Sequence, residues 1–460
     1  MTKYAATLHI LLIMILATWL SFPDKVWYWS CLLWLGISGL LIGLASPQQR
    51  QDESRAGASR RSWRTLRGDA FTGIFLLITL FLLVQALNGG REMVYNAELE
   101  QWNFGAPALA WAASHVNTAI SWQAVAWFCT FGTVALTVRH TMGKKLRLLL
   151  LHGVSINGAL LALWWCIAYF IGGTTDKIPP QQWFFILKGS TATLYHLIAA
   201  TIGLGLSLNT TATDNSRRYW LLLPPLLNLI GLLVTGTTLT TLCAWLWSLL
   251  AVVYGALYLQ ATANPKQRPL SMLFLGAFVV MAGLVIYKIA DNAELLWSGI
   301  TAQFAAWGVT NGTISTAWQL FANATLYGHG AGCFEILAPL HDWQVGATEV
   351  HGATCYGAVL ALAEYGLAGC SLMLIALAIV ISECVHRLGL TPQLPPASES
   401  WLGRRLLFRL SPVTVTALIG LAGVLVIGVN EPISRQNLAG ASAIIILLSL
   451  ASFLPLRKRI

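Results

Sequence analysis

An all-α integral membrane protein with about twelve transmembrane helices is the fold class that this sequence predicts. Of its 460 residues, 56 % are hydrophobic and only 10 % are charged, whereas a soluble domain has about 25 % charged residues. Apolar segments of about 20 residues, the length that crosses a bilayer as a helix, recur along the whole chain. We therefore interpret residues 1–460 as a single polytopic membrane domain.

The predicted spans follow one another with short polar connections, apart from one long connection. They are, approximately, residues 6–22, 27–46, 70–88, 121–138, 148–172, 190–209, 219–236, 238–260, 270–287, 355–385, 411–429 and 437–455. The first span has no small-residue cleavage site and a second soon follows it, so we interpret it as a membrane helix rather than a signal peptide. The long connection, residues 288–354, separates the ninth and tenth spans.

Basic residues are distributed unequally between the two sides of this predicted bundle. If the N-terminus lies inside, 22 of the 28 lysines and arginines fall in inner segments, with clusters in residues 47–69, 139–147 and 386–410. Those left outside are Lys25, Arg91, Lys177, Lys188, Lys288 and Arg435. The positive-inside rule therefore predicts that both termini are cytoplasmic and that residues 288–354 form a large external loop. The net charge of +10 is then an orientation signal, and its distribution does not indicate nucleic-acid binding.

Two other polar connections carry expectations of their own. Residues 47–69 are predicted to be a basic cytoplasmic loop whose arginines contact anionic lipid headgroups. The external connection from Gly89 to about Ile120 contains several Trp and Tyr residues. These aromatic residues are explained either by the headgroup level of the membrane, which Trp and Tyr favour, or by a lid over a lipid-linked substrate.

The long loop and the span after it hold the unusual polar residues. A short amphipathic helix is predicted over residues 314–324. It leads into GHGAG at 328–332, whose glycines allow either a turn that ends a helix or a close approach to a ligand. Glu364 follows near the start of the tenth span, where a carboxylate is costly enough to indicate function. The same carboxylate can also hold the helix and loop geometry through hydrogen bonds.

Two phrases of this region resemble the O-antigen ligase and polymerase superfamily of bacterial membrane glycosyltransferases. Trp318 is followed by TLYGHGAGCF at 325–334, similar to the glycine-rich end of the family's large periplasmic loop. LAEYGLAG at 362–369 is similar to the membrane helix that comes next, and QALNGG at the end of the third span is a weaker similarity. The resemblance implies about twelve helices with one large periplasmic loop, in the bacterial inner membrane, with the site facing the periplasm.

The resemblance also implies a chemistry. The family moves a glycan from undecaprenyl diphosphate onto an acceptor sugar, either lipid A core or a growing polymer, without a metal, a nucleotide sugar or another cofactor. External cations hold the diphosphate where leaving-group charge builds up, and a loop histidine assists the attack of the acceptor hydroxyl. The implied partners are membrane lipid, the lipid-linked glycan donor, a glycan or lipid acceptor and other polysaccharide-assembly proteins.

Three family positions differ in this chain. Cys355 stands where the family has its histidine, and Ile314 stands where it has an arginine before the loop tryptophan. Gly-Thr-Thr at 236–238 replaces a serine-arginine-glycine turn. His351, one helical turn before Cys355, is the histidine that we expect to replace the catalytic base. The alternative is a solvated loop histidine.

Other side chains must then bind the diphosphate. The candidates outside the membrane are Arg91, Lys188, Lys288 and Arg435, with His341 as a further substrate-binding residue. Each cation can instead be an interfacial residue that extends its charge into water, and His341 and His329 can be structural or solvent-exposed. The candidate catalytic residues are His351 and Glu364, and no cysteine spacing indicates a metal site.

Two alternatives to an enzyme stay open. One is a member of the same fold that has lost catalysis and binds or scaffolds lipid-linked glycan in an export assembly. The other is a membrane transporter, although transporters often carry charged residues at mid-membrane and the polar residues here gather in one external loop. Cys333 and Cys355, the cysteines in or beside that loop, are predicted to form a disulfide under oxidising conditions, unless depth in the membrane keeps Cys355 away from its partner.

Overall fold

The structure is a computed structural model in which part of the chain is described. The described residues are 2–20, 25–45, 55–89, 93–96, 101–104, 107–172, 189–209, 215–235, 238–262, 315–334, 336–338, 357–389 and 412–430, with isolated residues between 272 and 290. All structural statements below concern these residues.

Helices make up nearly all of the described chain. They are α1 (Thr2–Trp19), α2 (Val26–Ala45), α3 (Arg55–Arg67), α4 (Ala70–Leu87), α5 (Thr118–Thr141), α6 (Lys144–Gly172), α7 (Gly189–Asn209), α8 (Asn215–Thr235), α9 (Thr238–Thr262), α13 (Gly357–Gly389) and α15 (Pro412–Asn430). All of these except α3 coincide with predicted spans. Within the described residues, six helices are long and apolar enough to cross a membrane, and four more apolar helices are shorter. The predicted total of twelve spans is not reached, because 437–455 and most of 270–287 lie outside the described residues.

The outer surfaces of these helices are apolar. On α4, one face is buried against α5 and α13 while Leu76, Leu77 and Leu80 are exposed. A helix that is hydrophobic on all sides is typical of a membrane span, and exposed apolar rows of this kind suit contact with lipid. The chain is therefore an α-helical membrane protein.

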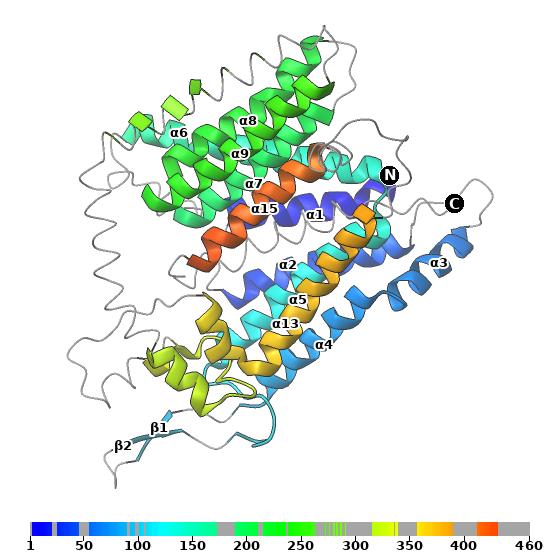
Figure 1. Cartoon of the computed structure of the whole chain (residues 1–460). Helices are drawn as coiled ribbons and strands as arrows, with labels where there is room; N and C mark the ends of the chain where they lie inside the picture. The colour runs from blue at the N-terminus through cyan, green and yellow to red at the C-terminus, as the bar shows by residue number, and fades with distance from the viewer. Residues whose placement is uncertain are drawn as a thin grey trace.

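The helices form two groups that share α1 (Figure 1). In the first group, α6, α8, α9 and α15 pack around α7, whose residues Thr191–Leu208 are buried throughout. In the second group, α5 packs against α2 and α4, and α13 packs against α4. His196 of α7 is buried and hydrogen-bonds through Nδ1 to Asn228 Oδ1 of α8 at 3.0 Å.

Two predicted loops contain secondary structure that the sequence analysis missed. Residues 47–69 were expected to be a loop, but α3 forms there because Leu66 packs against Leu44 of α2 and Leu136 of α5. The connection after α4, predicted to be external, contains an antiparallel hairpin of β1 (Met93–Asn96) and β2 (Gln101–Phe104).

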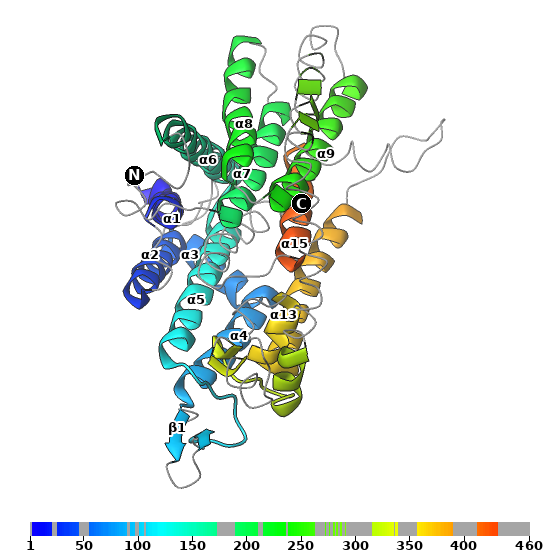
Figure 2. The same cartoon turned by 90° about the vertical axis from the view of Figure 1, so that its left-hand side faces the viewer.

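The two ends of the molecule carry different segments. The hairpin and the described residues of 315–334 lie at one end (Figures 1 and 2), and α3 lies at the end of α4 that is farthest from them (Figure 1). The two described segments that are predicted to be external therefore share one end, and the basic segment at α3, which is predicted to be internal, lies away from them. Which end faces the cytoplasm stays a prediction from the charge distribution.

Candidate functional site

The site is built on a break in α13. Gly366 has φ 62° and ψ −169° in the middle of the helical run, a combination open essentially only to glycine. The turn of helix at this point loses its regular hydrogen bonds, and the exposed backbone groups on both sides of Gly366 need other partners.

The glycine-rich loop supplies those partners. Four backbone hydrogen bonds of 2.9–3.0 Å join it to the break, two on each side of Gly366. They run from His329 N to Ala363 O, from Gly330 N to Glu364 O, from Leu367 N to Thr325 O and from Ala368 N to Leu326 O. The two phrases that carry the family resemblance are therefore bonded directly to each other.

Glycine is required on both sides of this contact. Gly328, Gly330 and Gly332 have φ values of 69°, 94° and 82°, which other residues rarely adopt. A Cβ on Gly328 would overlap the backbone of Glu364, and a Cβ on Gly366 would lie 2.5 Å from the backbone nitrogen of Gly328. The predicted turn is confirmed, and the backbone it approaches closely is that of α13.

The side chain of Glu364 strengthens the same junction. It is only 7 % exposed, and its Oε1 accepts a 2.9 Å hydrogen bond from the backbone N–H of Gly332. A hydrogen bond to a charged group contributes about 1.5–3 kcal/mol. Glu364 thus holds the loop geometry through a hydrogen bond, which is one of the two roles predicted for its carboxylate. Its catalytic role stays a prediction.

Three residues near the end of α4 extend the site, and sequence reasoning did not identify them. Gln85 donates from Nε2 to Glu364 O at 3.2 Å, and its own carbonyl lies 2.8 Å from His115 Nδ1. The side chain of Asn88 donates to the carbonyls of Leu109, Ala112 and Ala113 and accepts from Leu109 N. The one available signal was QALNGG, which contains both Gln85 and Asn88 but was only a weak family similarity.

An apolar cluster lies beneath the loop. It contains Ala317, Leu320, Cys333, Phe334, Leu337, Ala338, Leu360 and Ala363. Residues 315–323 are helical, as predicted, and His329 Nε2 lies 2.9 Å from the carbonyl oxygen of Leu320. His329 therefore has the structural role expected of it. The cluster joins the chain before residue 339 to the chain after residue 356.

Most of the predicted site residues lie outside the described part of the chain. They are His341, His351, Arg91, Lys188, Lys288 and Arg435. Cys355 also lies outside it, so its disulfide with the buried Cys333 stays a prediction. In the described ranges, no group of three or more His, Cys, Asp or Glu side chains is placed to hold a metal ion.

The described site holds the two ends of one loop in a defined position. Residues 325–338 and 357–368 are bound to each other, and between them runs the 339–356 segment that contains His341 and His351. No known family model matches the chain, and no curated protein matches it. A function for this chain therefore has to be drawn from its own residues and their geometry.

Proposed function

We propose that this protein is a membrane glycosyltransferase of the O-antigen ligase and polymerase type. It moves a polyprenyl-diphosphate-linked glycan onto an acceptor sugar at the periplasmic face of the bacterial inner membrane. Its two termini lie in the cytoplasm, in agreement with the positive-inside rule.

One observation carries the proposal. The glycine-rich phrase at 325–334 and the glutamate phrase at 362–369 form a single hydrogen-bonded junction around Gly366. Two unrelated short similarities would have no reason to meet in the fold, whereas two parts of one site would. The junction holds both ends of the segment containing His351, and fixed ends limit the conformations of a loop that must present a base to a sugar hydroxyl.

The proposed reaction uses the external residues in distinct roles. The acceptor hydroxyl attacks the anomeric carbon, and the bond between that carbon and the diphosphate oxygen breaks. His351 takes the hydroxyl proton, while polyprenyl diphosphate leaves with the electron pair. Arg91, Lys188, Lys288 and Arg435 bind the diphosphate, and His341 contacts the substrate. The reaction needs no metal or other cofactor.

Glu364 acts in this proposal through the loop. Its carboxylate accepts from Gly332 N within a buried junction, so this proposal makes it a positioning residue for the 339–356 segment, in place of the catalytic role for which the sequence made it a candidate. Glu364→Gln keeps an acceptor oxygen at this point, and Glu364→Ala does not.

The experiment is glycan transfer from the polyprenyl carrier, in membranes from a strain that lacks the gene and carries either wild type or a variant. His351→Ala is expected to lower the rate by about 10²–10⁴-fold, the usual contribution of general-base assistance. His329→Ala is the matched control because its ring bonds to the carbonyl of Leu320 within the loop, and it should retain most of the transfer. Equal transfer by wild type and His351→Ala would remove the base assignment.

The alternative is a protein of the same fold that binds or scaffolds lipid-linked glycan without catalysis, together with polysaccharide-assembly proteins. It is favoured by Cys355 and Ile314, which stand at two positions where the family has a histidine and an arginine. No transfer by wild type, with the donor and acceptor supplied, combined with retention of the donor on the purified protein would support this alternative. If the wild-type protein neither transfers the glycan nor retains the donor, a membrane transporter is the remaining function.

A further inference from the structure

A stripe of exposed residues runs along α3. Arg60, Trp63, Arg64 and Arg67 follow each other at the i, i+3, i+4 and i+7 spacing of one helix face. All four are exposed, Trp63 at 39 %. The three guanidinium groups form no ion pair with any residue that the structure describes.

Another face of α3 is fixed to the bundle. Leu66 is 8 % exposed and packs against Leu44, Phe75 and Leu136. Because Leu66 lies next to Arg67 in sequence and about 100° away around the helix, burying it turns the stripe away from the bundle.

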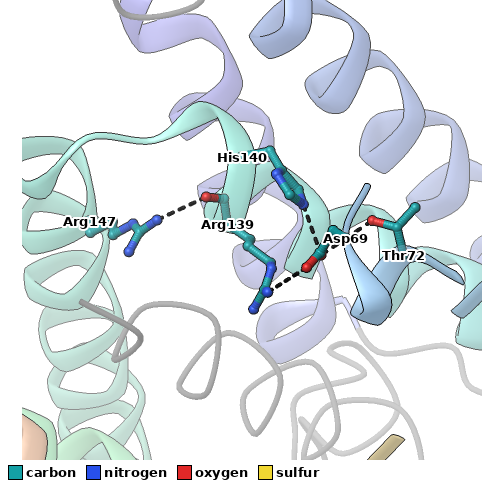
Figure 3. Close-up of polar contacts among 5 residues, drawn as sticks. All are labelled: Asp69, Thr72, Arg139, His140 and Arg147. Carbon is teal, nitrogen blue, oxygen red and sulfur yellow. Dashed lines mark hydrogen bonds and ion pairs between the residues drawn. The ribbon is translucent and has the colours of Figure 1, made fainter. Parts of the chain in front are cut away.

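An acidic residue close to α3 is already neutralised. Asp69, two residues after α3, accepts from Arg139 Nη2 at 2.6 Å and lies 3.2 Å from His140 Nε2 (Figure 3). Arg139 also lies over the ring of Phe71, 5.6 Å from its centroid. The negative charge of Asp69 is therefore bound to α5, and α3 itself contains no Asp or Glu.

The stripe starts at the depth of lipid headgroups. α4 is apolar from Ala70 to Leu87, and α3 continues beyond it at the end of the molecule opposite the hairpin (Figure 1). A helix rises about 1.5 Å per residue, so the three to six residues between Ala70 and Arg67 or Arg64 correspond to roughly 5 to 10 Å along a helix from the apolar start of α4. The headgroup layer occupies about that distance beyond the hydrocarbon core.

We propose that the Arg60–Trp63–Arg64–Arg67 stripe of α3 binds the anionic phospholipid headgroups of the leaflet at that end of the protein. Guanidinium groups bind phosphate oxygens in a bidentate manner, and an indole ring favours the headgroup level. Each arginine near an anionic membrane surface contributes about fivefold in affinity. The inference does not depend on glycosyl transfer. An acidic protein or a nucleic acid is less suited than lipid, because the stripe begins within reach of the bilayer.

The test measures amide hydrogen exchange of residues 60–67 in the full chain. The protein is placed in nanodiscs of phosphatidylcholine alone or with about one third phosphatidylglycerol. Exchange in wild type is expected to slow about tenfold or more with the anionic lipid, and added salt should reverse part of this protection. The triple variant Arg60→Gln, Arg64→Gln, Arg67→Gln should lose the lipid dependence.

Lys145→Gln is the matched control, since it removes an exposed basic residue near the start of α6 outside the stripe. It should keep the lipid dependence. Thermal unfolding in phosphatidylcholine nanodiscs checks that the triple variant is folded. If the triple variant does not fold, the single variant Arg64→Gln replaces it, with a smaller expected loss of the lipid dependence. Equal exchange of wild type in both lipids would overturn the proposal. So would protection that appears only after an acidic protein or RNA is added, or a Lys145→Gln variant that loses the lipid dependence as fully as the triple variant.

Discussion

Gly366 and Gly328 face each other where the glycine-rich loop meets α13, and neither has room for a β-carbon. The close approach allows four backbone hydrogen bonds and brings Gly332 N to the Glu364 carboxylate. In an apolar environment, backbone groups that lack partners cost several kcal/mol. A single glycine therefore determines whether the break in α13 is stable.

Gly366→Ala is the prediction at this scale. Alanine at φ 62° and ψ −169° carries about 1–3 kcal/mol of strain, and its methyl group would push the loop away from α13. We expect a lower midpoint of thermal unfolding in detergent and faster alkylation of Cys333, which is buried under the loop, in a variant whose other cysteines are replaced.

Gly73→Ala provides the comparison. Gly73 lies in α4, where an added β-carbon would meet no other atom within 4 Å, and alanine in a helix is favoured over glycine by about 1 kcal/mol. This variant should be as stable as wild type or more so, with Cys333 protected. Similar behaviour of the two variants would mean that the Gly366 junction does not hold the loop.

Residue identities in the site were partly predictable. The GHGAG turn and the hydrogen-bonding role of Glu364 followed from the glycine spacing and from the cost of a carboxylate in a span. Gln85 and His115 did not, because the hydrogen bonds that join them to the site, from Gln85 to Glu364 and from His115 to Gln85, link residues 30 positions apart or more. No local sequence pattern encodes such a contact.

At the scale of elements, Asp69 connects three helices. It is the N-cap residue of α4, lies two residues after the end of α3, and binds Arg139 and His140 at the end of α5 (Figure 3). Burial raises its pKa, but the hydrogen bonds and charges of His140 and Arg139 outweigh this and lower the pKa from 3.8 to about 2. The carboxylate is therefore charged in the folded protein down to strongly acidic pH.

This shift predicts a pH dependence. Because the folded pKa lies below the unfolded value, the contribution of Asp69 to the free energy of unfolding is complete above about pH 4 and is lost as the pH falls toward 2. Asp69→Asn should lower stability by about 1–2 kcal/mol at neutral pH, after allowance for partial solvent screening. Chemical unfolding of both proteins in detergent, from neutral pH downward, measures the difference. The difference in the free energy of unfolding between the two proteins should shrink in the acidic range. A difference that stays constant down to pH 2 would contradict the stabilising role of the Asp69 carboxylate.

Helices and loops differed in how well the sequence predicted them. Span positions followed from hydropathy, and α4, α7 and α9 begin within one residue of their predicted starts. The β1–β2 hairpin was missed because residues 97–100, AELE, contain none of the Gly, Asn or Asp residues that usually mark tight hairpins. α3 was missed because its strongly polar composition hides Leu66, which packs the helix against α2 and α5.

At the scale of the whole molecule, a polar network crosses the apolar interior. Asn157 of α6 donates to Thr18 of α1 and Tyr195 of α7 and accepts from Trp19 Nε1. Asn228 of α8 donates to Ser155 O of α6. In a membrane, helices are not driven together by the hydrophobic effect, and hydrogen bonds of this kind, together with close packing, specify which helices associate. Hydropathy alone predicts the helices but not this arrangement.

The orientation of the molecule is the last prediction. The charge distribution places α3 and the start of α6 inside and the glycine-rich loop outside, and α3 and this loop lie at opposite ends of the helix group that contains α4, α5 and α13 (Figure 1). In a cysteine-free background, Asn323→Cys should react with a membrane-impermeant maleimide in intact cells. Lys145→Cys should react only after the cells are permeabilised. Both positions are exposed, so a failure to react reports the barrier and not burial. Labelling of Lys145→Cys but not Asn323→Cys in intact cells would invert the protein and move the proposed site to the cytoplasm, where a periplasmic glycan donor is absent.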